Sequence, residues 1–449
     1  MPPSADHRQQ SKPQRPPRGA LFAAAIVGVA LLVACHQPSA QPATPVIAPT
    51  VPAVAPTTSP AENAPGTPEP TAVALQLWLP PDIARASVTI DGRTLLYTEA
   101  LAEEAALPGN VQLVVTTKSL HGDAGLLESM LATAPVVPER LPHLILLDSV
   151  DLPALVDAGL VQPIAGLDEA TYWDTLTPVA ESAVTISGTR YGAPLCADLL
   201  LLAYDQSAVT TPPATWQALA SGEATLLFPA AEGPTASDTL LALYLSAGGF
   251  VAESEPRLDT TALTRALSAY QLGREAGRIH SASVDTADAD TSWAAYAAGK
   301  ADMVIVTSQQ LLQYGEDAPG TAIAPVPAGG AEPVTLARVL TWAIVSDDES
   351  VQDLALAYIR ASAAPEAQRL LTARTFHLPV VASALDQESL GDWHAALSQQ
   401  MASARPLPAF SNQAGLEEAL AQAGASVLAG TAGPAEAANL AATKVSALK

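Results

Sequence analysis

The stretch Leu144-Ile145-Leu146-Leu147-Asp148-Ser149, with the segment from Leu152 to Gly159 that follows it, contains the pattern on which the fold of this chain depends. Four consecutive apolar residues predict a strand that is buried on both faces, as the strands of parallel sheets are. Residues 151–158 have an acidic start and are followed by Gly159, which predicts a helix that ends at a glycine. A buried strand followed directly by a helix predicts an α/β fold, in which helices cover a mostly parallel sheet.

The same alternation continues along the chain on both sides of this stretch. Further strands are predicted at residues 73–79, 111–115, 199–204, 225–228, 303–306 and 339–345, and a hairpin is expected to turn at Ser187-Gly188. Helices are predicted at residues 93–106, 123–132, 237–247, 261–276, 292–298 and 350–361, and the Ala-rich segment from Gly391 onward is expected to be helical. The folded part of the protein is therefore expected to begin near residue 73.

The composition excludes several classes of protein. The chain has 449 residues, a formal net charge of -24, 39 prolines, two cysteines and 4% aromatic residues. This acidity argues against a nucleic-acid partner bound through a broad basic surface, and two cysteines exclude a disulfide-stapled scaffold. No nucleophile elbow, Walker loop or zinc-protease motif is present, and the acidic loop of Asp285, Asp288 and Asp290 lacks the glycine and glutamate of a calcium loop. The sequence predicts no cofactor, no metal site and no catalysis.

The N-terminus has the features of a targeting segment. Basic residues precede an apolar run at residues 20–34, which is shorter than the roughly 20 residues that a membrane-spanning helix needs. The run ends in Leu32-Val33-Ala34-Cys35, which resembles a bacterial lipobox, so residues 1–34 are expected to be a signal peptide and Cys35 to be lipidated. An uncleaved short membrane segment with an incidental cysteine is the alternative.

Residues 35–72 are expected to form a linker behind that lipid anchor. Ten prolines lie among the 37 residues from 36 to 72. Proline fixes φ and removes a backbone donor, so this composition favours an extended spacer over a helix or a sheet strand. The spacer would let the folded part move above a membrane.

Seven short segments, in this order and behind a lipobox, resemble the bacterial extracellular solute-binding proteins of ABC transporters, and are most similar to the maltose-binding-like group. The segments are residues 75–81, 144–163, 190–194, 213–216, 296–303, 365–368 and 378–380. The resemblance implies an α/β, two-lobed periplasmic-binding-protein-like fold of type II, in which each lobe is a mostly parallel sheet flanked by helices and hinge strands join the lobes. It places the N-terminal lobe at residues 73–195 plus 338–376 and the C-terminal lobe at residues 196–337 plus 377–449.

The resemblance also implies a function and partners. A small solute, carbohydrate-type by family, would bind in the cleft between the lobes, and closure around it would present the protein to ABC permease subunits. The membrane partner would be reached through the lipid on Cys35, at the outer face of the cell membrane, by a protein that we expect to be a monomer. The alternative function is a surface lipoprotein of the same fold that senses a signal or binds another protein.

Residues at strand ends are the candidates for the ligand site, because ligands of open α/β sheets bind beyond the carboxyl ends of the strands. Each candidate also has a structural interpretation, as a core residue or as a helix cap. Cys196 in particular needs no function as a small buried residue. The candidates are Trp78, Pro80, Asp148, Ser149, Cys196, Asp198, Ser237, Asp238, Thr307, Ser308, Gln309 and Trp342.

Aromatic residues bear on the kind of solute. Sugar sites stack aromatic rings on the sugar, and the sugar-binding relatives often have an aromatic residue after the strand that ends here near Val306. This chain has Gln309 there, and the later Pro-rich turn offers only Phe410. These departures argue against a large oligosaccharide and leave a smaller sugar or another polar solute open.

Overall fold

The computed structural model describes residues 72–122, 124–231, 233–251, 257–286, 288–330, 332–409 and 411–448. The predicted signal peptide, the predicted lipidation site Cys35, the linker up to residue 71 and Phe410 lie outside these residues. Ala72–Lys449 forms one compact unit. In the part of the chain that is described, no helix combines the length and the apolar character that crossing a membrane requires.

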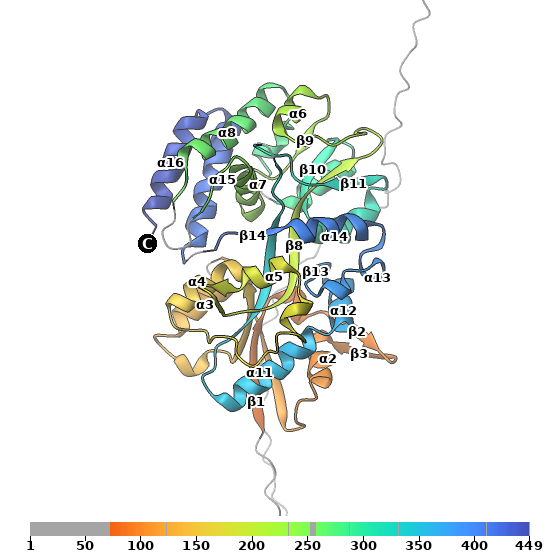
Figure 1. Cartoon of the computed structure of the whole chain (residues 1–449), viewed down its shortest axis with the longest axis vertical. Helices are drawn as coiled ribbons and strands as arrows, with labels where there is room; N and C mark the ends of the chain where they lie inside the picture. The colour runs from red at the N-terminus through yellow and green to blue at the C-terminus, as the bar shows by residue number, and fades with distance from the viewer. Residues whose placement is uncertain are drawn as a thin grey trace, which may run out of the picture. The chain divides into compact units, whose positions relative to one another are not determined.

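One large mixed sheet runs through this unit, with its main strands in the order β4-β1-β5-β12-β8-β10-β9 (Figure 1). The strand β1 pairs in parallel with β4 and β5, and β10 pairs in parallel with β9. By contrast, β12 is antiparallel to β5 and β8, and β8 is antiparallel to β10. Their bounds are β1 Val73–Leu79, β4 Val111–Thr117, β5 Leu144–Asp148, β8 Ala193–Asp205, β9 Leu226–Leu227, β10 Met303–Thr307 and β12 Leu336–Ile344.

Short strands complete the sheet and form two separate hairpins. The strands β11 (Thr321–Ala324) and β13 (Leu378–Pro379) pair with β8, and β14 (Arg405–Pro406) pairs with β12. One hairpin joins β6 (Thr185–Ile186) to β7 (Thr189–Arg190), as the sequence predicts. The other joins β2 (Ser87–Ile90) to β3 (Arg93–Leu96).

Helices cover the sheet in both lobes. Their bounds are α1 Pro81–Ala84, α2 Tyr97–Glu104, α3 Leu126–Thr133, α4 Leu152–Asp157, α5 Pro178–Ala183, α6 Trp216–Ser221, α7 Pro234–Ser246, α8 Thr260–Glu275, α9 Ala289–Ala297, α10 Ser308–Tyr314, α11 Glu349–Ser362, α12 Pro365–Thr375, α13 Gln387–Leu390, α14 His394–Ser403, α15 Gln413–Ala429 and α16 Pro434–Ser446. A 3-10 turn, η2 (Ser149–Asp151), stands between β5 and α4. The C-terminal helices α15 and α16 pack beside α7 and α8 (Figure 1).

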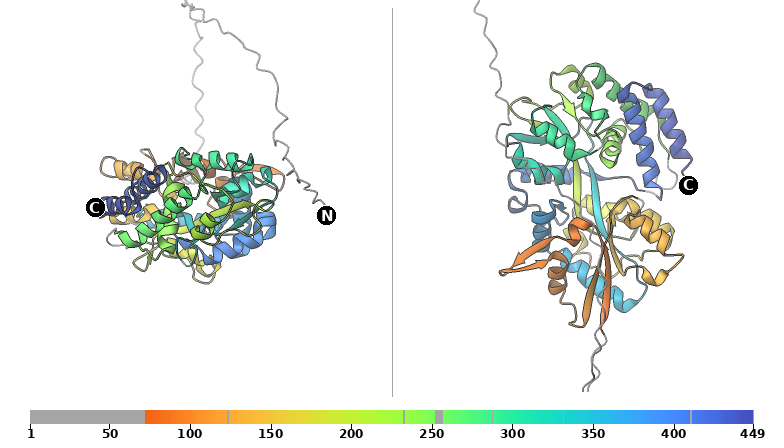
Figure 2. Two further views of the ribbon diagram at one scale, coloured as in Figure 1. Left: turned by 90° about the horizontal axis from the view of Figure 1, so that it is seen from above. Right: turned by 180° about the vertical axis from the view of Figure 1, so that it is seen from behind.

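Two long strands join the lobes. The strands β8 and β12 pass from the lobe that contains β1, α2 and α11 into the lobe that contains α7, α8 and α15 (Figures 1 and 2). Two buried apolar clusters hold the unit together, and both reach β10: Val304 and Val306 belong to the first cluster, Met303 and Ile305 to the second. Successive side chains of a strand point to opposite faces, so one strand supplies both clusters.

The helix predicted at residues 93–106 is wrong in its first turn. The chain forms β3 at Arg93–Leu96 and enters α2 only at Tyr97. The reason is the turn Asp91-Gly92, in which both residues have positive φ, 50° and 76°. Asp-Gly with two positive φ values is the favoured two-residue hairpin turn, so it pairs β2 with β3 and overrides the helical spacing.

Candidate functional site

A cavity of about 210 Å³ lies where strand ends and helix starts from both lobes meet. Its walls include five charged or ionisable side chains from five different elements. Asp148 ends β5, Asp198 lies in β8, Asp238 lies in the second turn of α7, Arg338 lies in β12, and His377 precedes β13. The cavity therefore borders elements of both lobes.

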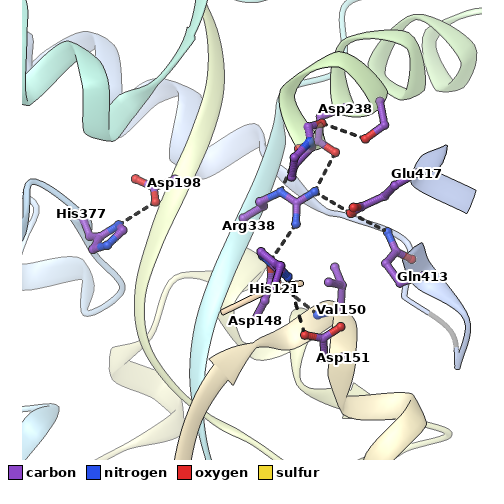
Figure 3. Close-up of polar contacts among 12 residues, drawn as sticks. His121, Asp148, Val150, Asp151, Asp198, Asp238, Arg338, His377, Gln413 and Glu417 are labelled. Carbon is purple, nitrogen blue, oxygen red and sulfur yellow. Dashed lines mark hydrogen bonds and ion pairs between the residues drawn. The ribbon is translucent and has the colours of Figure 1, made fainter. Parts of the chain in front are cut away.

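Arg338 is the centre of one side of this cavity (Figure 3). Its Nε and Nη2 donate to the two oxygens of Asp238 at 2.9 and 3.0 Å. Its Nη1 donates to Asp148 Oδ2 at 2.7 Å, and Nη2 also donates to Glu417 Oε1 at 2.7 Å. One guanidinium therefore holds three carboxylates that come from β5, α7 and α15.

Local structure positions these partners. Asp148 stands at the end of β5, and its Oδ1 accepts a hydrogen bond from the backbone of Val150 at 3.2 Å, which caps η2. Arg338 is the only charged residue of β12, and it lies opposite Asp198 of β8 in the sheet register. An arginine in an otherwise apolar buried strand needs carboxylate partners, and those partners come from distant parts of the chain.

His377 is the centre of the other side of the cavity. Its Nδ1 lies 2.6 Å from Asp198 Oδ2, and its Nε2 lies 2.9 Å from Asp82 Oδ2. Burial opposes the charge on this imidazole, but the carboxylates of Asp198 and Asp82 outweigh burial and raise the pKa of His377 to about 10. His377 is therefore a cation at neutral pH, held between two carboxylates.

Asp151 lies beside the Arg338 cluster and behaves differently from its neighbours. Its side chain is buried, and His121 Nδ1 lies 4.0 Å from its Oδ2, while His121 Nε2 lies 3.7 Å from Asp148 Oδ2. Burial and then the charges of Asp148, Glu128 and Glu417 raise the pKa of Asp151 to about 8. At neutral pH this carboxyl group keeps its proton, because a further negative charge is unfavourable there.

The structure brings several predicted site residues to this cavity. Asp148, Asp198, Asp238, Thr307 and Gln309 line it. Thr307 caps α10 by accepting from the backbone of Gln310 at 3.3 Å. Ser308 is buried next to the wall: its hydroxyl donates to Asp198 Oδ1 at 3.3 Å. Gln309 donates through Nε2 to the carbonyl oxygen of Thr375 at 3.0 Å.

Four predicted residues that do not line the cavity have local roles. Pro80 is buried at the start of α1, and its carbonyl oxygen accepts from the backbone of Ala84. Ser149 opens η2, and Ser237 donates to the carbonyl oxygen of Pro234 at 2.8 Å. Cys196 is a free, buried thiol whose pKa is raised well above its ordinary value by burial.

The two predicted tryptophans also lie away from the cavity wall. Trp78 is buried, with Lys118 Nζ 5.0 Å from the centroid of its ring. Trp342 is fully buried, packs edge-on against Tyr358 and donates through Nε1 to Ser362 Oγ at 3.1 Å. Both indole groups fill the core of the lobe that contains β1.

Sequence reasoning missed Arg338, His377 and Glu417. A signal for Arg338 exists, since it is the only charge within the apolar segment of residues 336–344. No comparable signal marks Glu417, which is one of two adjacent glutamates in its helix, or His377, which stands before a two-residue strand. Only the approach of α15 and of the segment before β13 to the cavity identifies them.

The arrangement is suited to binding. Leucine side chains make up much of the cavity lining, and carboxylates are prominent among its polar groups. Arg338 and His377 on its walls are already engaged by carboxylates. Within the described ranges, no group of histidine, cysteine, aspartate and glutamate side chains is placed to hold a metal ion. The chemistry available is therefore recognition of a polar solute by carboxylates and amide groups.

Known proteins share this architecture. A cyclo/maltodextrin-binding protein complexed with maltotetraose matches with a TM-score of 0.65 at 20% identity, covering 84% of this chain and 98% of its own. The GacH receptor of Streptomyces glaucescens, solved unliganded and with acarbose, matches with a TM-score of 0.62 at 18% identity, covering 84% of this chain and 97% of its own. Maltose-bound T. maritima MalE3 matches with a TM-score of 0.65 at 14% identity, covering 83% and 99%. At these identities the likeness shows the fold.

Sequence comparison assigns the family. No curated protein sequence matches the chain. Residues 113–398, which are well over half of the chain, match the family described as bacterial extracellular solute-binding protein. This family and the structural neighbours are binding proteins and not enzymes. The predicted family and two-lobed α/β fold are thus confirmed, and the chain belongs to the bacterial extracellular solute-binding proteins.

Proposed function

We propose that this protein is a lipid-anchored extracytoplasmic receptor that captures a small polar solute between its lobes and delivers it to an ABC importer. The observation that carries the proposal is the cavity whose walls combine Asp148, Asp238 and Arg338 with Asp198 and His377. Such residues can contact one solute simultaneously only when the lobes are together. Solute binding would then favour the closed form that a permease can recognise.

The proposed solute is small and of carbohydrate type. The volume of about 210 Å³ is below the range of about 300–1,000 Å³ that is common for drug-sized ligands. The structural neighbours were solved with maltotetraose, acarbose and maltose, which supports a polyhydroxylated solute. The carboxylates and Gln309 can accept and donate the hydrogen bonds that hydroxyl groups need.

A ligand screen by thermal unfolding tests the receptor function. Sugars, polyols, amino acids and polyamines should include a solute that raises the unfolding midpoint, since a ligand at 100 times its Kd stabilises the folded state by about 2.7 kcal/mol. Asp198→Asn should weaken that shift, because Asp198 lines the cavity. Asp353→Asn, an exposed change on α11, serves as the control and should leave the shift intact. The receptor function is contradicted when no small solute raises the midpoint.

Lipid anchoring is supported by the sequence Leu32-Val33-Ala34-Cys35 and by the linker behind it. Mass spectrometry of the protein from its native membrane should show a mature N-terminus at Cys35 that carries a lipid. An unmodified Cys35 in a chain that still begins at Met1 would contradict the anchor. That result would leave solute capture untouched, because the cavity lies entirely within Ala72–Lys449.

A further inference from the structure

We infer that the interlobe cavity binds a small solute that carries a protonated amine as well as neutral polar groups, an inference that rests on this cavity being the solute site proposed above. The observations that carry it are the hydrogen bonds of the two cations on the cavity walls and the number of carboxylates around them.

Neither cation is free to bind an anionic solute. Arg338 has five N–H groups, and four hydrogen bonds to Asp148, Asp238 and Glu417 occupy all but one of them. His377 faces Asp198 with one ring nitrogen and Asp82 with the other. A carboxylate or phosphate would have to displace these protein carboxylates, so the site disfavours anions.

Negative charge exceeds positive charge at this site. Three carboxylates, Asp148, Asp198 and Asp238, line the cavity with Arg338 and His377, which leaves an excess of one negative charge on its walls. Asp82 and Glu417 contact the same two cations from outside the lining, and they bring the excess of the whole network to three. A proton on His121, which also lines the cavity, would still leave an excess of two. Each of these carboxylates contacts Arg338 or His377, but five of them share two cations, so a further positive charge would be favourable beside them.

One buried acceptor next to Glu417, outside the cavity lining, lacks a hydrogen-bond partner in the described part of the chain as well. Gln413 donates through Nε2 to Glu417 at 3.4 Å, and its buried Oε1 has no hydrogen-bond partner among the described residues (Figure 3). A neutral sugar would supply donors to such acceptors but no charge. An ammonium group supplies three donors and a positive charge together, and so meets both needs.

Asp151 responds first to its burial and then to the negative charges beside it. Its carboxyl group is buried beside Asp148 and keeps its proton at neutral pH, with a pKa near 8. A cation in the adjacent cavity would lower that pKa, and part of the proton would leave as the solute binds. Binding of an amine should therefore be coupled to proton release, whereas binding of a neutral analogue should not be.

Calorimetry with matched pairs of solutes tests this inference. The probes are 6-amino-6-deoxyglucose against glucose, and 1,4-diaminobutane against 1,4-butanediol, in two buffers of different protonation enthalpy at neutral pH. We expect an amine to bind at least about tenfold more tightly than its hydroxyl partner, which corresponds to about 1.4 kcal/mol. We also expect proton release with the amine alone.

A pair of variants on one helix separates the charge effect from general damage. Glu417→Gln preserves the side chain's shape and an acceptor for Arg338 but removes one negative charge from the site, so it should reduce the preference for the amine severalfold. Glu418→Gln is the control, since Glu418 is exposed on the same helix and its carboxylate accepts a hydrogen bond from Gln422. Equal effects of the two changes would overturn the inference.

The outcomes distinguish this inference from the receptor function. If the hydroxyl compound of a pair binds as tightly as the amine, the inference is wrong, but the proposed receptor function still stands. The inference is also wrong, and the receptor function again stands, if none of the four probes binds and the thermal screen finds a neutral or anionic solute. Absence of any binding solute in that wider screen contradicts both proposals.

Discussion

Replacing Arg338 with alanine is expected to reduce the free energy of unfolding by about 3–5 kcal/mol, the usual effect of removing one partner from a buried ion pair. The guanidinium holds Asp148, Asp238 and Glu417, and its side chain is only 16% exposed. Without it, three carboxylates face one another with little water around them. Urea denaturation at neutral pH, followed by circular dichroism, measures the change.

Two further variants make this result specific. Arg369→Ala is the control, because Arg369 also binds two carboxylates, Glu366 and Asp386, but does so at the surface, where such pairs contribute about 0–1 kcal/mol. Arg338→Lys keeps the charge but loses the bidentate hydrogen bonds to Asp238, and should give an intermediate loss. If Arg338→Ala and Arg369→Ala cost the same, the cluster does not organise the cleft.

Stability is expected to fall as pH rises from about 5 to 8, mainly through Asp151. The pKa of Asp151 is about 8 in the folded protein, against 3.8 as the ordinary value. Between these values the folded state holds a proton that the unfolded state has lost, so unfolding becomes easier with each pH step. One such proton corresponds to a slope of about 1.4 kcal/mol per pH unit.

Two other groups act in the same direction over neighbouring windows. Burial, partly offset by Arg338, raises the pKa of Asp238 to about 6. Burial lowers the pKa of His377, but the carboxylates around it have the larger effect and raise that pKa to about 10. The stability that each group contributes is complete below its unfolded pKa and is lost as pH rises through its folded pKa. The decline should therefore continue above neutral pH.

The substitution Asp151→Asn isolates the contribution of Asp151 to the pH dependence of stability. Asparagine is neutral at every pH, as the protonated aspartate is in the folded protein. The variant should therefore be more stable than the parent near pH 8. The slope of its free energy of unfolding against pH should be less steep by about the contribution of one proton. Denaturation profiles of both proteins across this range provide the measurement. Parallel profiles would show that Asp151 ionises normally in the folded protein.

Local features of the sequence determined the element types and part of the site. The apolar run Leu144–Leu147 forms the buried strand β5, and Gly159, with a φ of 66°, follows the helix that the sequence predicts there. Asp148 and Asp198 could be selected because a polar residue in a strand or at a strand end is visible locally. Asp238 was selected as a residue of the helix start, although α7 begins at Pro234 and Asp238 lies in its second turn. The hairpin at Asp91-Gly92 was missed although its signal is local, because the helical spacing behind it was given more weight.

Tertiary structure alone decided the sheet order and the charge balance of the site. The strand β12 is inserted between β5 and β8, so it brings Arg338 to Asp148 across 190 positions of sequence. His377 meets Asp82 across 295 positions, and Glu417 reaches Arg338 from the helix α15. Periodicity and capping act over a few residues, so they show which segments are strands and helices. Which carboxylates share one guanidinium depends on packing between segments that are far apart in the chain, and that packing gives the cluster its net negative charge.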